Sequence, residues 1–368
     1  MDICFIAGTL GRGGAEKQLV YMLRALVQGG EDVRLLCLTR GEAYEEEIRA
    51  LGVEVEFIGA SSHRISRLIA ITRNLRKRRP DIIQSSHFYT NIYAAIAGMI
   101  LRIPSVGAVR SNLRSELKIN GSLGKAQLGL PDLIIANSEA AREYALSRGS
   151  NPERIMVVQN VIEPRETDRP SPPAGKLVTF LFAGRLGQEK RPDRFIQMAA
   201  DLIEQNPTDP LRFLMAGDGV LRPTLEETVR KVPALSEKFE FLGEVSNMDQ
   251  VFQDADVLVL TSDYEGTPNV ILEAMAAGLP VIANNVGGVE ALIGEDRGIL
   301  VDPTDDNALT AAAANFLRDP EMNRKLAQNA IAKVRRDHSP DQLYGQLTRI
   351  YTKILRAGNA EDPASVTI

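Results

Sequence analysis

Cysteine and histidine are scarce in this chain of 368 residues, which contains two cysteines and three histidines. Too few of these residues cluster in the sequence to build a structural zinc site. Cys4 and Cys37 each fall in an apolar, strand-like run. This placement indicates small buried hydrophobic residues in a reducing compartment.

Long hydrophobic runs are also missing. The most apolar segment, Ile92 to Leu101, stops at Arg102 and is too short to span a bilayer. The N-terminus has no basic region followed by a long apolar stretch, so we expect no signal peptide. These absences predict a cytoplasmic protein.

The composition is that of an ordinary soluble globular protein, with 44% hydrophobic and 25% charged residues. Its length suits two domains. The formal net charge of -5 conceals an asymmetry: through Asp168 the chain has 22 Lys and Arg against 19 Asp and Glu, and the remainder has 21 against 29. The first half therefore suits an anionic partner, whereas the acidic whole argues against general nucleic-acid binding.

The most informative stretch is Thr261 to Gly288, TSDYEGTPNVILEAMAAGLPVIANNVGG. A continuously apolar run, Val257 to Leu260, precedes it and is typical of a parallel strand covered on both faces. Thr267 followed by Pro268 predicts the N-cap and first residue of a helix. We expect this helix to end near Ala277, because glycine and proline follow.

Within that helix Glu273 is a strongly polar residue, and an unpaired buried carboxylate would be costly. The free N–H groups and partial positive charge of the helix start suit a phosphate. A ligand with a phosphate at the helix start and a diol near Glu273 fits a nucleotide sugar. An ordinary strand–helix unit with a solvated glutamate is the alternative.

The segment EGTPNVILE, Glu265 to Glu273, resembles the E-x7-E signature of glycosyltransferase family four, and the residues that follow it are similar to the family's pattern. The resemblance extends over nearly the whole chain. It implies a retaining enzyme with two Rossmann-like domains, the GT-B fold, in which Glu265 contacts the donor sugar and Glu273 the ribose. The implied donor-binding residues of this segment are Gly266, Thr267, Pro268, Asn269, Val270 and Glu273.

A glycine-rich turn, Gly8 to Gly14, follows the first predicted strand, Ile3 to Ala7. It does not fit a dinucleotide fingerprint, because Glu16 occupies the third glycine position. A tight strand-to-helix turn needs glycine in any case. The turn resembles the family's GGAE segment, which implies that Gly13 and Gly14 lie under the donor diphosphate and sugar.

His87 is the last residue of another predicted strand, Asp81 to His87. Residues at the carboxyl ends of parallel strands point into the ligand crevice of doubly wound folds. A structural role is the alternative for a lone strand-end histidine. The position matches the active-site histidine of the resembled family, which implies a catalytic role through hydrogen bonds to the transferred sugar.

Arg185 and Lys190 lie in a predicted loop at the end of the strand Leu177 to Ala183. Arg can bind phosphate through two nitrogens and Lys acts as a mobile point charge. A salt-bridged loop is the alternative. The resemblance to the family's GR-x4-K pattern implies a diphosphate clamp with a catalytic role, and places the nucleotide base near Val245.

Asp254-Ala255-Asp256 spells the DxD metal motif of a different glycosyltransferase fold, but it precedes a buried strand and would lie at the wrong edge of the sheet. We therefore expect no metal and no cofactor, with the nucleotide-sugar donor as a substrate. The two cations and the helix start can take the place of Mg²⁺.

The acceptor side is less defined. The segment Arg64 to Arg79 is helical in pattern and heavily basic, with an apolar stripe at Ile65, Leu68, Ile69 and Leu75. It predicts either a solvated surface helix or a patch attracted to anionic lipid at the inner face of a membrane. Arg110 and Arg114 open a polar segment, expected to be an irregular loop through Gly129, and are candidates to bind an anionic acceptor.

We predict an α/β protein with two Rossmann-like, doubly wound domains facing each other across a cleft. The expected domains are 1–168 on the acceptor side, 169–340 on the donor side, a crossover helix at 341–356 that packs back on the first domain, and a disordered tail at 357–368. The expected reaction moves a sugar from a UDP- or GDP-linked donor to an acceptor hydroxyl, with a lipid-linked or cell-envelope glycan as the acceptor. A nucleotide-sugar epimerase and a non-catalytic nucleotide-sugar-binding protein are the alternatives.

Overall fold

The computed structural model describes residues 1–110, 113–165 and 176–360. The chain forms two compact units, Met1–Val161 with Pro340–Ile368, and Ile162–Ser339. The predicted boundary at 168/169 lies outside the described residues. The Ile162 N–H donates to the carbonyl of His338 (2.9 Å), which joins the segment that enters the second unit to the one that leaves it.

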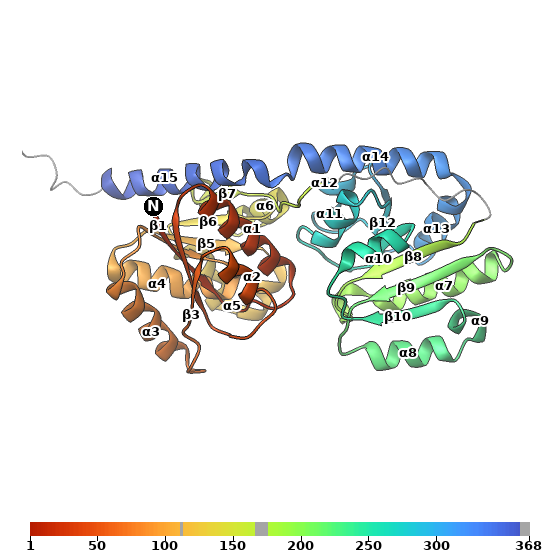
Figure 1. Ribbon diagram of the computed structural model, residues 1–368, viewed down its shortest axis with the longest axis horizontal. Coiled ribbons are helices and arrows are strands. Elements are labelled where there is room, and N and C mark those ends of the chain that lie inside the picture. The colour runs from red at the N-terminus through yellow and green to blue at the C-terminus, as the bar shows by residue number, and fades with distance from the viewer. Residues whose placement is uncertain (111–112, 166–175, 361–368) are drawn as a thin grey trace, which may run out of the picture. The chain divides into compact units, whose positions relative to one another are not determined.

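Among the described residues, the first unit contains a seven-stranded sheet in the order β3-β2-β1-β4-β5-β6-β7, with every pair parallel (Figure 1). Its strands are β1 (Asp2–Ala7), β2 (Asp32–Cys37), β3 (Glu54–Phe57), β4 (Ile82–Ser85), β5 (Ser105–Val109), β6 (Leu133–Ala136) and β7 (Ile155–Val157). Its helices are α1 (Gly14–Gln28), α2 (Glu45–Ala50), α3 (Arg64–Lys77), η1 (Phe88–Thr90), α4 (Asn91–Leu101), α5 (Leu113–Gly129), α6 (Glu139–Ser147), η2 (Pro152–Arg154), η4 (Pro340–Gln342) and α15 (Leu343–Ala360).

The second unit contains, in its described part, a six-stranded parallel sheet in the order β10-β9-β8-β11-β12-β13. Its strands are β8 (Val178–Ala183), β9 (Leu211–Ala216), β10 (Phe239–Gly243), β11 (Val257–Leu260), β12 (Val281–Asn284) and β13 (Ile299–Val301). Its helices are η3 (Gln188–Lys190), α7 (Pro192–Gln205), α8 (Arg222–Arg230), α9 (Pro233–Ser236), α10 (Met248–Asp254), α11 (Asn269–Ala276), α12 (Val289–Ile293), α13 (Ala308–Arg318) and α14 (Pro320–Asp337).

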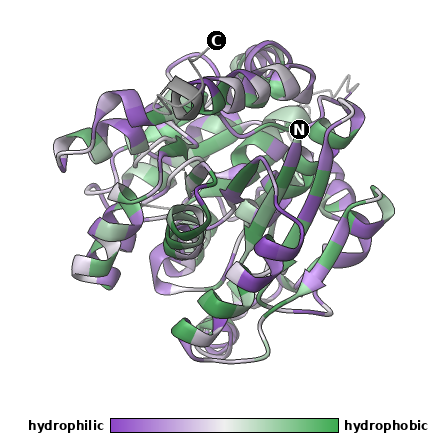
Figure 2. Ribbon diagram, turned by 90° about the vertical axis from the view of Figure 1, so that its left-hand side faces the viewer, coloured by the Kyte–Doolittle hydropathy of each residue, from purple (hydrophilic) through white to green (hydrophobic). Residues whose placement is uncertain are grey.

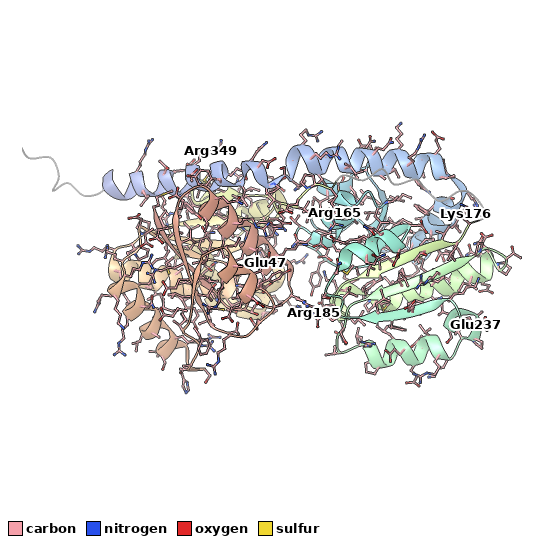
Figure 3. All side chains as sticks on the ribbon, viewed as in Figure 1. Glu47, Arg165, Lys176, Arg185, Glu237 and Arg349 are labelled. Carbon is pink, nitrogen blue, oxygen red and sulfur yellow. The ribbon has the colours of Figure 1, made fainter. Side chains whose placement is uncertain are left out.

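Both sheets reverse their strand order at the corresponding place, between β1 and β4 in the first unit and between β8 and β11 in the second. In open α/β sheets, ligands bind outside the carboxyl ends of the strands at such a switch point. Figure 3 shows this polarity for β8, with Lys176 near its amino end and Arg185 near its carboxyl end. The order of the strands therefore marks one candidate edge on each unit.

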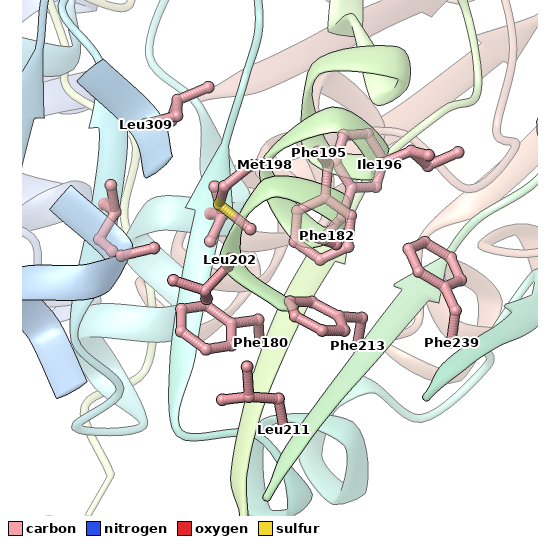
Figure 4. Packing of buried hydrophobic residues seen from close by; sticks show 14 of the residues in the cluster. Phe180, Phe182, Phe195, Ile196, Met198, Leu202, Leu211, Phe213, Phe239 and Leu309 are labelled. Atoms are coloured by element: carbon pink, nitrogen blue, oxygen red, sulfur yellow. The ribbon is translucent and has the colours of Figure 1, made fainter. Parts of the chain in front are cut away.

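The strands are apolar because helices cover both faces of each sheet. Figure 2 shows hydrophobic residues along the strands and hydrophilic residues on the outer faces of helices. In the second unit the core includes packed phenylalanines (Figure 4): Phe180 and Phe213 are stacked with ring centroids 5.5 Å apart, and Phe195 and Phe239 lie edge to face at 5.8 Å. In the first unit Cys4 and Cys37 are buried free thiols, as predicted, and burial raises the pKa of Cys4 to about 12.

Helix α15 belongs to the first unit, which confirms that the C-terminal helix packs back on the first domain. Tyr351 is fully buried, and its hydroxyl hydrogen-bonds to Gln84 of β4. The Tyr344 hydroxyl donates to Glu31 (2.9 Å). The helix continues to Ala360, so residues 357–360, which were expected to belong to a disordered tail, are helical. Residues 361–368 lie outside the described residues.

Two local predictions were wrong. The segment expected to be an irregular loop through Gly129 is helix α5, which bends at Gly121 because this residue takes φ 54° and ψ −127°. Helix α11 begins at Asn269, one residue later than predicted, with Pro268 as the extended N-cap. The glycine therefore bends a helix instead of marking a loop, and the proline precedes the helix instead of opening it.

Candidate functional site

His87 lies at the carboxyl edge of the first sheet, in the turn between β4 and η1. Its Nδ1 is 3.2 Å from the Gly8 backbone nitrogen and 2.9 Å from the Ser86 hydroxyl. A backbone N–H can only donate, so Nδ1 is the acceptor and the imidazole proton is on Nε2. Nε2 then donates to Oε1 of Glu16, at 3.0 Å.

Glu16 is a site residue that we did not select from the sequence. Its side chain and that of His87 are about nine-tenths buried, at 10% and 9% exposure. A Cβ on Gly13 would lie 2.2 Å from Oε2 of Glu16. Gly13 therefore leaves room for this carboxylate in its contact with His87, and Gly14 is the first residue of α1.

Tyr89 is held beside the imidazole in a similar way. Its ring centroid is 5.5 Å from that of His87, and a Cβ on Gly8 would lie 1.6 Å from the Tyr89 hydroxyl. Burial, together with the charge of Glu16, raises the pKa of Tyr89, which is thus a neutral phenol at physiological pH. Glycine at position 8 and position 13 makes room for the two side chains that flank His87.

Glu42 anchors the turn that precedes Gly13. Its carboxylate accepts hydrogen bonds from the Thr9 hydroxyl (2.8 Å), the Thr39 hydroxyl (2.5 Å) and the Leu10 N–H. Partial burial opposes ionisation, but these hydrogen bonds outweigh it and lower the pKa of Glu42. The charged carboxylate therefore holds the turn between β1 and α1.

Arg110 and Arg114 lie in different environments. Arg110 follows β5 and is half-buried, with Nη1 3.4 Å from Oδ1 of Asn160 and Nη2 3.0 Å from the Met22 sulfur. Its buried Nε has no hydrogen-bond partner among the described residues. Burial lowers the pKa of Arg110 to about 10, so the side chain remains charged at neutral pH. Arg114 is exposed in the first turn of α5.

The structure brings Lys190 and Glu265 together at the carboxyl edge of the second sheet. Lys190 Nζ donates to Oε1 of Glu265 at 2.6 Å, and the Ser262 hydroxyl donates to the same oxygen at 2.6 Å. The Glu265 side chain is 8% exposed, whereas that of Lys190 is 27% exposed. Lys190 is therefore salt-bridged, as the alternative interpretation of this loop predicted.

Hydrogen bonds to backbone carbonyls hold the two loops that carry Lys190 and Glu265. The Asp263 N–H donates to the carbonyl of Glu189 (3.0 Å), and the Thr261 hydroxyl donates to the carbonyl of Lys190 (2.8 Å). Asn284, buried at the end of β12, donates from Nδ2 to the carbonyl of Thr261 (2.9 Å). Ser262 and Asn284 were not selected from the sequence.

Gly287 and Gly288, at the end of the segment NNVGG, allow this segment to approach the backbone of the Glu265 loop closely. Gly287 has φ +55°, and a Cβ there would lie 1.9 Å from the carbonyl oxygen of Glu265. A Cβ on Gly288 would lie 2.3 Å from the carbonyl oxygen of Gly266, which accepts the Gly288 N–H at 3.1 Å. The two backbones touch, so side chains at these positions would displace the Glu265 loop.

Arg185 differs from Lys190, although both follow β8. It is exposed, and its side chain has no ion-pair or hydrogen-bond partner within the part of the chain that the structure describes, although its carbonyl accepts the Gly187 N–H (2.9 Å). Figure 3 shows Arg185 at the end of the second sheet, away from Lys176. A charged side chain that is not engaged by protein groups is available to an anionic ligand.

The other predicted donor residues lie at the same edge. Glu265 and Gly266 precede α11, Thr267 and the buried Pro268 lead into it, and Asn269, Val270 and Glu273 are on the helix, all three half-buried. Val245 follows β10 and is half-buried. By contrast, Asp256 of the DxD sequence accepts the Thr179 N–H (2.8 Å) before β11, at the opposite edge of the sheet, as predicted.

Two family models match the chain. Glycosyltransferase Family 4 matches residues 12–166, and Glycosyl transferases group 1 matches residues 164–333. The GalNAc-alpha-(1->4)-GalNAc-alpha-(1->3)-diNAcBac-PP-undecaprenol alpha-1,4-N-acetyl-D-galactosaminyltransferase of Campylobacter jejuni is 28% identical, over 90% of this chain and 92% of that protein. The UDP-Gal:alpha-D-GlcNAc-diphosphoundecaprenol alpha-1,3-galactosyltransferase of Escherichia coli is 26% identical, over 79% of this chain and 81% of that protein.

Solved structures share the fold of this chain over nearly its whole length. Anabaena HepE in complex with UDP-glucose superposes with a TM-score of 0.83 at 19% identity, over 96% of this chain and 100% of that chain. The sucrose-phosphate synthase of Thermosynechococcus elongatus superposes with a TM-score of 0.79 at 20% identity, over 97% and 100%. The two matching family models, the named relatives and the two Rossmann-like units lead to one conclusion: the chain belongs to glycosyltransferase family four and uses a nucleotide sugar to glycosylate an acceptor.

Proposed function

We propose that this glycosyltransferase moves a sugar from a UDP-linked donor to a hydroxyl of a lipid-diphosphate-linked glycan, with retention of the anomeric configuration and without a metal ion. The donor half of this proposal rests on two observations at the carboxyl edge of the second sheet: Lys190 pairs with Glu265, and the side chain of Arg185, which follows the same strand as Lys190, is exposed and unengaged. Anabaena HepE binds UDP and UDP-glucose, and the Escherichia coli relative is named for UDP-Gal. These relatives support UDP over GDP.

The cations suit a leaving diphosphate. Negative charge grows on this group as the glycosidic bond breaks, so positioned cations stabilise the transition state more than the ground state. The side chain of Arg185 can bind the diphosphate without losing a protein contact, whereas Lys190 must exchange its contact with Glu265 for the phosphate oxygens. Glu265 is then free to accept hydrogen bonds from donor hydroxyls, and Glu273 to accept those of the ribose.

The first unit supplies the acceptor side of the proposal. The Campylobacter jejuni and Escherichia coli relatives act, by name, on undecaprenol-diphosphate-linked sugars. His87 and the Glu16 carboxylate that accepts its Nε2–H are the polar groups proposed to contact a sugar hydroxyl, and Arg110 and Arg114 are cations for an anionic acceptor. Among the described residues, no helix is both long and apolar enough to cross a membrane.

Peripheral contact with an anionic membrane is also part of the proposal. Arg64, Arg73, Arg76 and Lys77 of α3 are exposed, as are Ile65 and Ile69. The rest of the basic segment is engaged, since Arg78 pairs with Asp32 (2.7 Å) and Arg79 donates to the carbonyl of Leu101 (2.6 Å). Co-sedimentation with vesicles of anionic lipid should fall in Arg73→Glu/Arg76→Glu and stay unchanged in Arg324→Glu, an exposed arginine on α14.

Thermal unfolding with UDP, GDP, ADP and their sugars, with and without EDTA, tests the donor. A nucleotide at 100 times its Kd should add about 2.7 kcal/mol to the free energy of unfolding. We expect a shift with UDP and its sugars that EDTA leaves unchanged and that Arg185→Ala reduces, whereas Arg324→Ala does not. If GDP alone raises the unfolding temperature, the assignment of UDP as the donor nucleotide is wrong. If EDTA abolishes the shift, the metal-independent clamp is wrong. Nuclear magnetic resonance of the product's anomeric proton tests retention.

A further inference from the structure

A cavity of about 300 Å³ lies between α3, α4 and α5 in the first unit. Its walls are largely apolar and come from Leu68, Ile92, Tyr93, Ile96 and Leu123. Arg64 and Arg67 line it from the start of α3. We call this cavity the α3–α5 groove.

The groove reaches the candidate site through one side chain. Tyr89 lines the groove, and its ring is also the one that lies 5.5 Å from the imidazole of His87. Tyr89 has this position because Gly8 leaves room for its hydroxyl. A molecule in the groove would therefore lie one aromatic ring away from the group proposed to contact the sugar.

The surface around the groove is apolar as well. Ile65 of α3 is 74% exposed and Ile119 of α5 is 81% exposed. Arg64 is exposed, and Arg67 is half-buried, with its Nε donating to the carbonyl of Ser61 (2.7 Å). Asn120 and Gln127 of α5 also line the groove, but most of its lining is apolar. Together with the two cations, this lining matches a molecule that is a hydrocarbon at one end and an anion at the other.

We propose that the α3–α5 groove binds the first isoprene units of a polyprenyl diphosphate, with Arg64 and Arg67 at its phosphates. This inference rests on the proposed function, because it identifies the lipid-linked acceptor's own binding site. Burial of the chain supplies most of the affinity, because affinity rises with each CH₂ group that is removed from water. The arginines fix the polar end and attract it.

Binding of three probes to the full chain tests this assignment: farnesyl diphosphate, dimethylallyl diphosphate and inorganic pyrophosphate, measured by calorimetry. We expect farnesyl diphosphate to bind at least about 10-fold more tightly than dimethylallyl diphosphate, because it buries more CH₂ groups. Arg64→Gln should weaken both of these ligands by a similar factor. Equal affinities for the long and the short chain would overturn the proposal.

Ile96→Gln and Ile100→Gln form a matched pair on α4, because Ile96 lines the groove and the exposed Ile100 does not. Ile96→Gln should remove most of the chain-length difference, and Ile100→Gln should preserve it. If both variants reduce it equally, the chain is held by the exposed surface instead and the groove assignment fails. Leu123→Gln on α5 repeats the test if Ile96→Gln does not fold.

Thermal stabilisation by UDP, measured on the same samples, separates the two proposals. A UDP shift without chain-length dependence would overturn the groove alone. Chain-length dependence without any UDP shift would leave the groove in place and overturn the proposed donor.

Discussion

Each unit of this protein places an acidic and a basic side chain together at corresponding positions, but the acidic and basic members are exchanged between the two units. In the first unit Glu16, after β1, pairs with His87, after β4. In the second unit Lys190, after β8, pairs with Glu265, after β11. Each pair bridges the switch point of its sheet, which is where doubly wound folds bind ligands.

The difference lies in which member is free to change partners. Both members of the first pair are about nine-tenths buried, and His87 is also held through Nδ1 by the Gly8 N–H. In the second pair Lys190 is three times as exposed as Glu265. The first pair is therefore built to hold one geometry, and the second to exchange an internal partner for a ligand.

The largest effect should come from Lys190→Ala. Loss of one cation at a developing negative charge lowers turnover by about 10²–10³-fold. The variant also leaves Glu265 buried without its ion pair. Measurement of kcat/KM with the preferred donor checks the fall. Lys231→Ala is the control, because it removes a surface ion pair with Glu227 in the same unit. A loss of thermal stability with unchanged turnover would mean that Lys190 is structural.

Glu16→Ala should have the next largest effect. Without its acceptor the imidazole can rotate, and small misplacements of a reacting group cost up to about 100-fold in rate. We expect kcat to fall by about 10- to 100-fold while the Kd for UDP stays the same. Glu16→Gln keeps an oxygen that accepts from Nε2 and should recover most of the rate. A Glu16→Gln variant as slow as Glu16→Ala would show that the negative charge matters more than the orientation.

These two pairs also show what could be predicted from sequence. Strand β11 was predicted with its bounds, because a continuous apolar run identifies a buried parallel strand. Lys190 and Glu265 were selected because each matched a family pattern. Glu16 was missed as a site residue because its partner is 71 positions away. Helix α5 was missed because the glycine at its bend indicated a loop.

Gly287→Ala tests whether the Glu265 loop depends on close backbone contact. A positive φ costs a non-glycine residue about 1–3 kcal/mol, and here a Cβ would also collide with the carbonyl of Glu265. Gly52→Ala is a matched control, since Gly52 also has positive φ but open space around it. We expect Gly287→Ala to lower the melting temperature more than the control and to reduce UDP stabilisation. If the two substitutions lower the melting temperature equally, the Glu265 loop accommodates the added Cβ without loss of stability, and close backbone contact is not required.

The smallest effect is expected in the first unit, from the anchor at Glu42. Hydrogen bonds from Thr39, Leu10 and Thr9 lower the pKa of this carboxyl in spite of its partial burial. A lowered pKa in the folded state means that the stabilisation is complete above the unfolded pKa, near 4.5, and is lost as the pH falls through the folded value.

Wild type should therefore exceed Glu42→Gln in free energy of unfolding by up to about 1 kcal/mol at pH 7. The difference should be constant above about pH 5 and shrink below it. Denaturant titrations across this range measure it, with Glu46→Gln, at an exposed neighbouring carboxylate, as the control. A difference that grows as the pH falls would have the wrong sign. It would mean that the turn before Gly13 is held by something other than the charged carboxylate, and that the first pair's fixed geometry does not depend on this anchor.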